Sequence, residues 1–210
     1  MAHGPLYRVG FRRRREGKTD YRRRLGLLKS GETRVVVRTT NSNVIVQFVN
    51  YDETGDQIVA SAEARELKEM GYTGANNTPS AYLTGLLGAK RAKEAGVGNG
   101  VLDLGRANPH KGGVIFGALK GVIDGGVEVP AGDVFPDEAR LRAEHLKEKA
   151  AAFAASYEKI VGKPLPPKAE KPKGKGKPAQ GKGAPAPQAK PAGKGGEPKP
   201  AKEKKAKTPE

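Results

Sequence analysis

The composition of the chain changes abruptly at Lys163, and this change limits what can fold. From there onward the sequence is almost entirely Lys, Pro, Gly, Ala, Gln and Glu, with Leu165 as its one large aliphatic residue and no aromatic. Such a segment buries too little apolar surface to offset its loss of conformational entropy. We therefore predict a disordered tail over residues 163–210, which serves either as an arm that threads between partners or as a solubilising extension.

Positive charge is concentrated at the two ends of the chain. Residues 1–38 carry 12 basic and 3 acidic side chains, residues 39–162 carry 13 and 16, and residues 163–210 carry 14 and 4. Basic ends around a slightly acidic middle are typical of a polyanion binder whose arms contact phosphate. No apolar run approaches the roughly 18 residues of a membrane span, and no signal peptide is predicted. Cys is absent and the three His are scattered, so neither a metal site nor a cofactor is expected.

The stretch 18–162 has the size of one domain and the patterns of a mixed α/β fold. Four runs are predicted to form strands, at 34–40, 43–50, 57–62 and 101–104. Turns at Asn41 and Ser42 and at 52–56 separate the first three runs, which predicts an antiparallel meander. We therefore expect a single domain with a mixed, largely antiparallel sheet packed by helices, preceded by a basic N-terminal arm at residues 1–17.

Helical periodicity and end signals predict helices at 19–29, 63–70, 78–95, 114–123 and 137–161. Thr78 is the expected N-cap of the third, with Pro79 in its first turn. Glycines recur every four residues along one edge of the fourth, from Gly113 to Gly125, and each costs roughly 1 kcal/mol of helix stability in the interior. We attribute them to close packing against the sheet rather than to RNA contact. The apolar stripe of the last helix is interpreted as core packing rather than a partner surface.

The most informative segment is FRRRREGKTDYRRRLGLLKS, which begins at Phe11. Two arginine clusters, 12–15 and 22–24, supply guanidinium groups that can fork onto phosphate or stack on a base. Tyr7, Phe11 and Tyr21 interleave aromatic rings with these cations, a combination that favours binding to unpaired bases. RNA is favoured over DNA because no helix-turn-helix, zinc finger or basic zipper accompanies the arginines. A nuclear-targeting patch or a solvated basic face would show a similar charge count.

Several longer motifs carry a resemblance to a known family. FRRRREGKTDYRRRL, TNSNVIVQ, VLDLGRA and VIFGALKGVIDGG occur in the family's order within residues 7–146. In these motifs the chain resembles the ribosomal L-eighteen family in its archaeal and eukaryotic branch. The resemblance implies a non-catalytic constituent of the large subunit of cytoplasmic ribosomes. It also implies binding to 5S rRNA in the central protuberance, beside the large rRNA and the L-five family protein, with no membrane and no small-molecule substrate.

By the same resemblance, the RNA-contacting residues fall on the arm and on the first hairpin. The arm, which the resemblance places at Phe11 to Arg24, contributes Phe11, Arg12, Arg13, Arg14, Arg15, Lys18, Thr19, Tyr21, Arg22, Arg23 and Arg24. Tyr7, Arg8 and Lys29 are added as RNA contacts for their aromatic ring or positive charge. The hairpin contributes Arg38, Thr40, Asn41, Ser42, Asn43 and Gln47. Asn41 and Asn43 fit ordinary turn chemistry equally well, so both roles stay open there. The tail matches no motif of the family.

Two rival functions remain at the level of sequence. A metal-dependent nuclease could be built if Asp103 and Asp124 converged with Glu63 and Asp52 on a magnesium ion. A lone buried aspartate is more often satisfied by backbone donors or a lysine, and the chain has no phosphate-binding loop of the GxxxxGK[ST] type. A generic RNA chaperone would carry basic arms without a specific partner.

Overall fold

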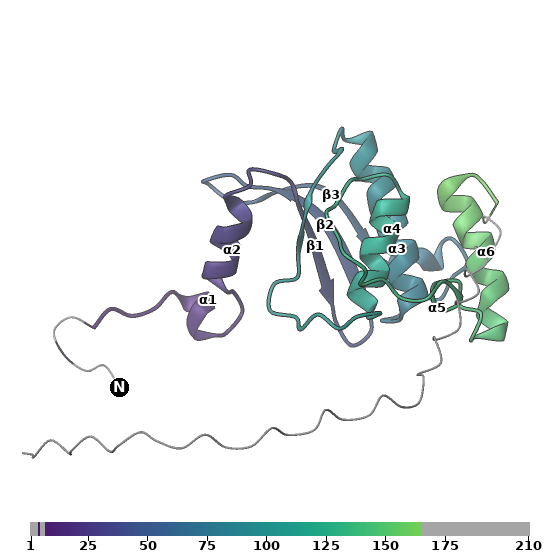
Figure 1. Ribbon diagram of the computed structural model, residues 1–210, viewed down its shortest axis with the longest axis horizontal. Coiled ribbons are helices and arrows are strands. Elements are labelled where there is room, and N and C mark those ends of the chain that lie inside the picture. Colours follow the sequence, from purple (N-terminus) through teal and green to yellow (C-terminus); the bar gives the residue numbers. More distant parts are fainter. Residues whose placement is uncertain (1–3, 5–6, 165–210) are drawn as a thin grey trace, which may run out of the picture. The chain divides into compact units, whose positions relative to one another are not determined.

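A four-stranded sheet forms the centre of the fold (Figure 1). A computed structural model describes Gly4 and residues 7–164, so the predicted tail lies almost entirely outside the described residues. The strands are β1 (Arg34–Thr39), β2 (Val44–Asn50), β3 (Gln57–Glu63) and β4 (Val101–Asp103). They lie in the order β3-β2-β1-β4, with β4 parallel to β1 and the other pairings antiparallel. The predicted meander and the mixed, largely antiparallel sheet are confirmed.

One face of the sheet is covered by helices (Figure 1). Strand alternation directs Val35, Val46 and Phe48 to this face, where all three are fully buried in one apolar core with residues of the helices. The helical elements are α1 (Arg12–Arg15), α2 (Tyr21–Leu28), η1 (Ala64–Lys68), α3 (Thr78–Glu94), α4 (Val114–Asp124), α5 (Glu138–Leu141) and α6 (Lys147–Val161). None of the helices within the described residues is long and apolar enough to cross a bilayer.

Three of the four predicted glycines, Gly117, Gly121 and Gly125, face helix α3 rather than the sheet, and Gly113 meets the backbone of His110, so that part of the interpretation was wrong. A methyl group added at Gly121 would overlap the backbone carbonyl oxygen of Tyr82, and one at Gly125 would overlap the side chain of Ala89. On α3, Gly85 meets the backbone of Ala118 in the same way. The missing side chains let the two helix backbones approach closely, as small residues do at other helix–helix contacts. The close approach was predicted, but the partner helix was not.

Two helix boundaries also differ from the prediction. Asn77 caps α3, because its side-chain Oδ1 accepts a hydrogen bond from the backbone N–H of Ser80 at 2.9 Å, while Thr78 is the first helical residue. The long helix expected over 137–161 is divided into α5 and α6. Ala143 lies between them with φ 58°, in the left-handed region that interrupts a right-handed helix. The apolar stripe itself is core packing as predicted, since Phe153 and Ile160 of α6 are buried.

Candidate nucleic-acid interface

The second arginine cluster lies on α2, a helix that starts at a strong cap. The Asp20 carboxylate accepts hydrogen bonds from the backbone N–H groups of Arg22 at 3.0 Å and Arg23 at 3.2 Å. These donors, that of Arg23 first, lower the pKa of Asp20 below its ordinary value, so the cap carries a negative charge at the positive end of the helix. The cap orders the helix that presents the cluster, and the helix predicted over 19–29 is confirmed in slightly shorter form.

The first cluster forms the single helical turn α1, and its side chains are exposed. Arg12 pairs with Glu16 at 3.7 Å, and Arg13 Nε donates to the Thr19 hydroxyl at 2.8 Å. Arg14 and Arg15 form no ion pair with any described residue. Because weak pairs between exposed groups offset little of their repulsion, the turn has unneutralised positive charge for an anionic partner.

Two of the three predicted aromatics come together beside the arginines. The rings of Phe11 and Tyr21 have centroids 5.3 Å apart and are tilted by 51°. Phe11 is 69% exposed and Tyr7 is 51% exposed, which is unusual for large apolar rings. Exposed rings next to guanidinium groups are available to stack on unpaired bases.

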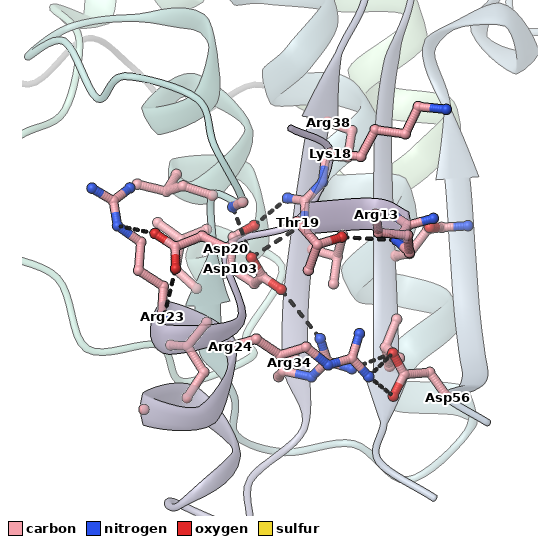
Figure 2. Close-up of a pocket in the computed structure, with 18 of the residues that line it drawn as sticks. Arg13, Lys18, Thr19, Asp20, Arg23, Arg24, Arg34, Arg38, Asp56 and Asp103 are labelled. Carbon is pink, nitrogen blue, oxygen red and sulfur yellow. Dashed lines mark hydrogen bonds and ion pairs between the residues drawn. The ribbon is translucent and has the colours of Figure 1, made fainter. Parts of the chain in front are cut away.

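Ion pairs attach α2 to the face of the sheet opposite the apolar core, called here the uncovered face (Figure 2). Arg24 Nη2 donates to both oxygens of Asp56 in the turn before β3, at 2.8 Å and 2.9 Å. Asp56 also contacts Arg34 Nη2 at 2.7 Å, an ion pair without hydrogen-bond geometry. Arg34 Nη1 continues the network to Asp103 at 3.2 Å, and Asp103 contacts Arg38 Nη2 at 3.2 Å.

This network joins residues that the sequence analysis had not connected. Arg34 and Asp56 were not predicted as site residues. Strand periodicity places Arg34 and Arg38, four residues apart on β1, on one face of the sheet, and this signal could have identified Arg34. No comparable signal exists for Asp56, which lies in a turn.

The hairpin residues predicted to contact RNA fall into two groups. Asn41 and Ser42 are exposed at the turn, whereas Asn43 is buried and its Nδ2 donates to Glu63 at 3.2 Å. The Thr40 hydroxyl accepts a hydrogen bond from the backbone N–H of Asn43 at 3.0 Å. The structure therefore gives Thr40 and Asn43 turn-stabilising contacts and leaves the tip of the hairpin available to a partner.

The remaining predicted residues lie at the surface or on the uncovered sheet face. Arg8, Arg22 and Lys29 are exposed, and Lys18 pairs with Glu16 at 2.9 Å. Gln47 is half-buried and lies on the uncovered face of β2, opposite Val36 of β1. The arm and β2 thus border a common surface.

The carboxylates considered for a metal site do not gather. Asp103 is held by Arg34, Arg38 and the backbone N–H of Gly105 at 2.7 Å. Asp124 accepts a hydrogen bond from the Tyr82 hydroxyl at 2.9 Å and forms an ion pair with Lys120 at 2.9 Å. Among the described residues, no group of three or more His, Asp or Glu is arranged to hold a metal ion.

Comparison with known proteins identifies the family. Residues 6–99 match the family model described as ribosomal large subunit proteins 60S L5 and 50S L18. Large ribosomal subunit protein uL18 of Korarchaeum cryptofilum is 51% identical over 160 residues, which cover 75% of this chain and 80% of the relative. The chain belongs to the uL18 family.

Two further uL18 proteins extend the comparison. That of Methanothermobacter thermautotrophicus is 49% identical over 152 residues, which cover 71% of this chain and 79% of the relative. That of Methanoregula boonei is 48% identical over 166 residues, which cover 77% of this chain and 95% of the relative. Membership in uL18 makes the chain a ribonucleoprotein component of the large subunit of cytoplasmic ribosomes, with rRNA and ribosomal proteins as its partners in translation. The family predicted from sequence motifs is confirmed.

Proposed function

We propose that this uL18 chain binds 5S rRNA and helps attach it to the large rRNA in the central protuberance, next to the L-five family protein. The 5S rRNA contacts are assigned to the two arginine clusters and their aromatic neighbours, with Asn41, Ser42 and Gln47 as a second contact surface. The role is structural, with no catalytic step.

The observation that carries the proposal is that an arginine-rich segment is both exposed and attached to the body. Arg24 and Asp56 fix α2 on the sheet, while Arg14, Arg15 and Arg22 remain without ion pairs among the described residues. A segment held in this way presents its cations in a fixed pattern, which favours recognition of one folded RNA over non-specific attraction.

Different parts of the chain have different roles in this function. Residues 1–17 form the arm that contacts phosphate, and residues 18–162 form the domain on which it rests. Residues 163–210 supply additional positive charge, and no contact is assigned to them because all but the first two lie outside the described residues.

Competition between RNAs tests the proposal. The full-length chain is mixed with labelled 5S rRNA and an excess of unrelated RNA of equal length, at moderate salt, and retention is measured. We expect selective retention of 5S rRNA, whereas comparable retention of both RNAs would point to a generic chaperone. Magnesium-dependent cleavage of the RNA that disappears in Asp103→Ala would point instead to a nuclease.

A further inference from the structure

A pocket separates α2 from the uncovered face of the sheet. It has a volume of about 620 Å³ and is lined by α2, the segment before it, and all four strands or the turns next to them. Figure 2 shows the charged side chains around it, with Arg24 and Arg34 converging on Asp56. This volume lies within the range of pockets that hold small ligands. The docked helix therefore leaves space for a chemical group beneath it.

The charge of the lining favours an anionic group. Its six basic residues are Arg13, Lys18, Arg23, Arg24, Arg34 and Arg38, against three aspartates. The aspartates already have partners within the protein: Asp20 caps α2, Asp56 contacts Arg24, and Asp103 contacts Arg38. Lys18 also contacts Glu16 at 2.9 Å, and the positive charge that remains in the lining attracts an anion.

One buried donor in the lining lacks an acceptor. Arg34 is 3% exposed, and its Nε has no hydrogen-bond partner. A buried donor without a partner is unfavourable, because it has lost its contact with water. The guanidinium of Arg34 therefore has hydrogen-bonding capacity that the described residues do not use.

The floor of the pocket is suited to a flat ring. Its exposed apolar surface comes from Ile58, which is 57% exposed, an unusual state for a large aliphatic side chain on a sheet, whereas Val36 and Val49 line the pocket as buried residues. The amide of Gln47 borders this floor and has no hydrogen bond to any described residue. An amide offers both donors and an acceptor, so it can read the edge of a base.

We propose that this pocket receives one unstacked nucleotide of the bound RNA. The base lies on Ile58 with its edge at Gln47, and its phosphate lies among the arginines. Proteins commonly recognise unpaired RNA bases in this way, by combining a stacking surface, a base-edge contact and cationic phosphate contacts. The inference rests on the proposed function, since it names a subsite within that interface.

Chemical probing of bases in the complex tests the subsite. Purified 5S rRNA bound to the full-length chain is treated with dimethyl sulfate and with a carbodiimide, which modify the pairing edges of unpaired bases. We expect at least one unpaired base to be protected by the native chain and to react again in complexes with Ile58→Trp, which fills the pocket, and with Gln47→Leu. Affinity for these two variants should fall about tenfold, the value of one lost base contact, and the slope of log affinity against log salt should fall by no more than about 1, the value of one lost phosphate contact.

Controls separate this inference from the proposed function. Val161→Trp adds the same side chain at an exposed position of α6 and should leave the protection unchanged. Protection that survives in both pocket variants would overturn the inference, as would a native complex in which no unpaired base is protected. A fall of about 3 to 4 in the salt slope of the variants would also overturn it, because the variants would then be displacing the whole arm rather than one nucleotide. If the native chain does not select 5S rRNA, the proposed function fails, and the same probing on the RNA it retains decides the subsite.

Discussion

Arg34 of β1 and Asp103 of β4 form an ion pair, at 3.2 Å, across the parallel edge of the sheet, and their side chains are only 4% and 9% exposed. Asp103→Ala would leave the buried Arg34 with Asp56 as its remaining acidic partner, and would remove the carboxylate that accepts from Arg38 and from the backbone N–H of Gly105. We predict that Asp103→Ala lowers the free energy of unfolding by about 3 kcal/mol, measured by urea denaturation.

A matched control is available at the surface. Asp133 pairs with Lys111 at 2.9 Å, but its side chain is 93% exposed. Asp133→Ala should leave the free energy of unfolding almost unchanged, because water solvates the remaining lysine. Equal effects of the two substitutions would contradict the structural role of Asp103.

Replacing Arg12–Arg15 by alanine should weaken RNA binding and make it less sensitive to salt. If each guanidinium neutralises one phosphate, the slope of log affinity against log salt falls by about 3 to 4. Titration by filter binding at several salt concentrations measures the slope. Removing Arg65 and Lys68, which are exposed basic residues of η1, should leave it unchanged. An unaltered slope after loss of the four arginines would exclude α1 from the interface.

Two glycines in helices should respond to alanine in opposite directions. At Gly121 the added methyl would overlap the carbonyl oxygen of Tyr82, so we predict a loss of about 2 kcal/mol in the free energy of unfolding. At Gly26 of α2 nothing lies within 4 Å of the added methyl, and the higher helix propensity of alanine should stabilise the fold by about 1 kcal/mol. Thermal or chemical denaturation measures both, and stabilisation by Gly121→Ala would contradict the α3–α4 packing.

Alkaline pH should destabilise the fold through Tyr82. Burial, reinforced by the negative charge of Asp124, raises the pKa of Tyr82 above its ordinary value of 10.0. The unfolded chain therefore releases this proton at a lower pH than the folded protein. Its contribution to stability is complete below pH 10 and is lost as the pH rises further. In Tyr82→Phe, the free energy of unfolding should fall less above pH 10 than it does in the native chain. If it falls equally steeply in both proteins, other groups cause the alkaline destabilisation.

Low pH should weaken the capping of helix α2 by Asp20. The pKa of Asp20 is lowered from 3.8, chiefly by the backbone N–H of Arg23, so the charged cap stabilises the helix above that pH and is lost as the pH falls further. We predict that the helical Cα chemical shifts of residues 21–28 in the native chain decrease when the solution is made acid. In Asp20→Ala they should be lower than in the native chain already at neutral pH. Asp20→Asn retains a capping oxygen and should show no acid transition there. An identical acid transition in Asp20→Asn would refute the role of the carboxylate.

Local patterns were sufficient to predict most secondary structure and the arm. The turn residues Asn41 and Ser42 and the alternation of the flanking strands indicate the hairpin directly, because both signals depend on adjacent residues. The break at Ala143 was missed since no Gly or Pro marks it. The Gly121 contact was assigned to the wrong element because periodicity identifies a crowded face but not what lies against it.

The pocket and its ion network depend on long-range contacts that the sequence analysis could not identify. Arg34 and Asp103 are separated by 69 positions, and Arg24 and Asp56 by 32, so no short motif connects either pair. The network forms only because β4 pairs with β1 in parallel and the turn before β3 reaches α2. The exposed arginines could be predicted, whereas the residues that orient them required the fold.

These separations along the chain have a consequence for synthesis. Translation produces Arg34 and Arg38 well before Asp103, so the emerging polypeptide is at first a cationic strand whose internal counterions do not yet exist. During that interval any nearby nucleic acid competes for the guanidinium groups. Asp56 supplies the first counterion of Arg34, and completion of β4 supplies its second and that of Arg38, whereas the arginines of α1 stay exposed. The order of chain growth therefore distinguishes the cations paired within the fold from those exposed to RNA.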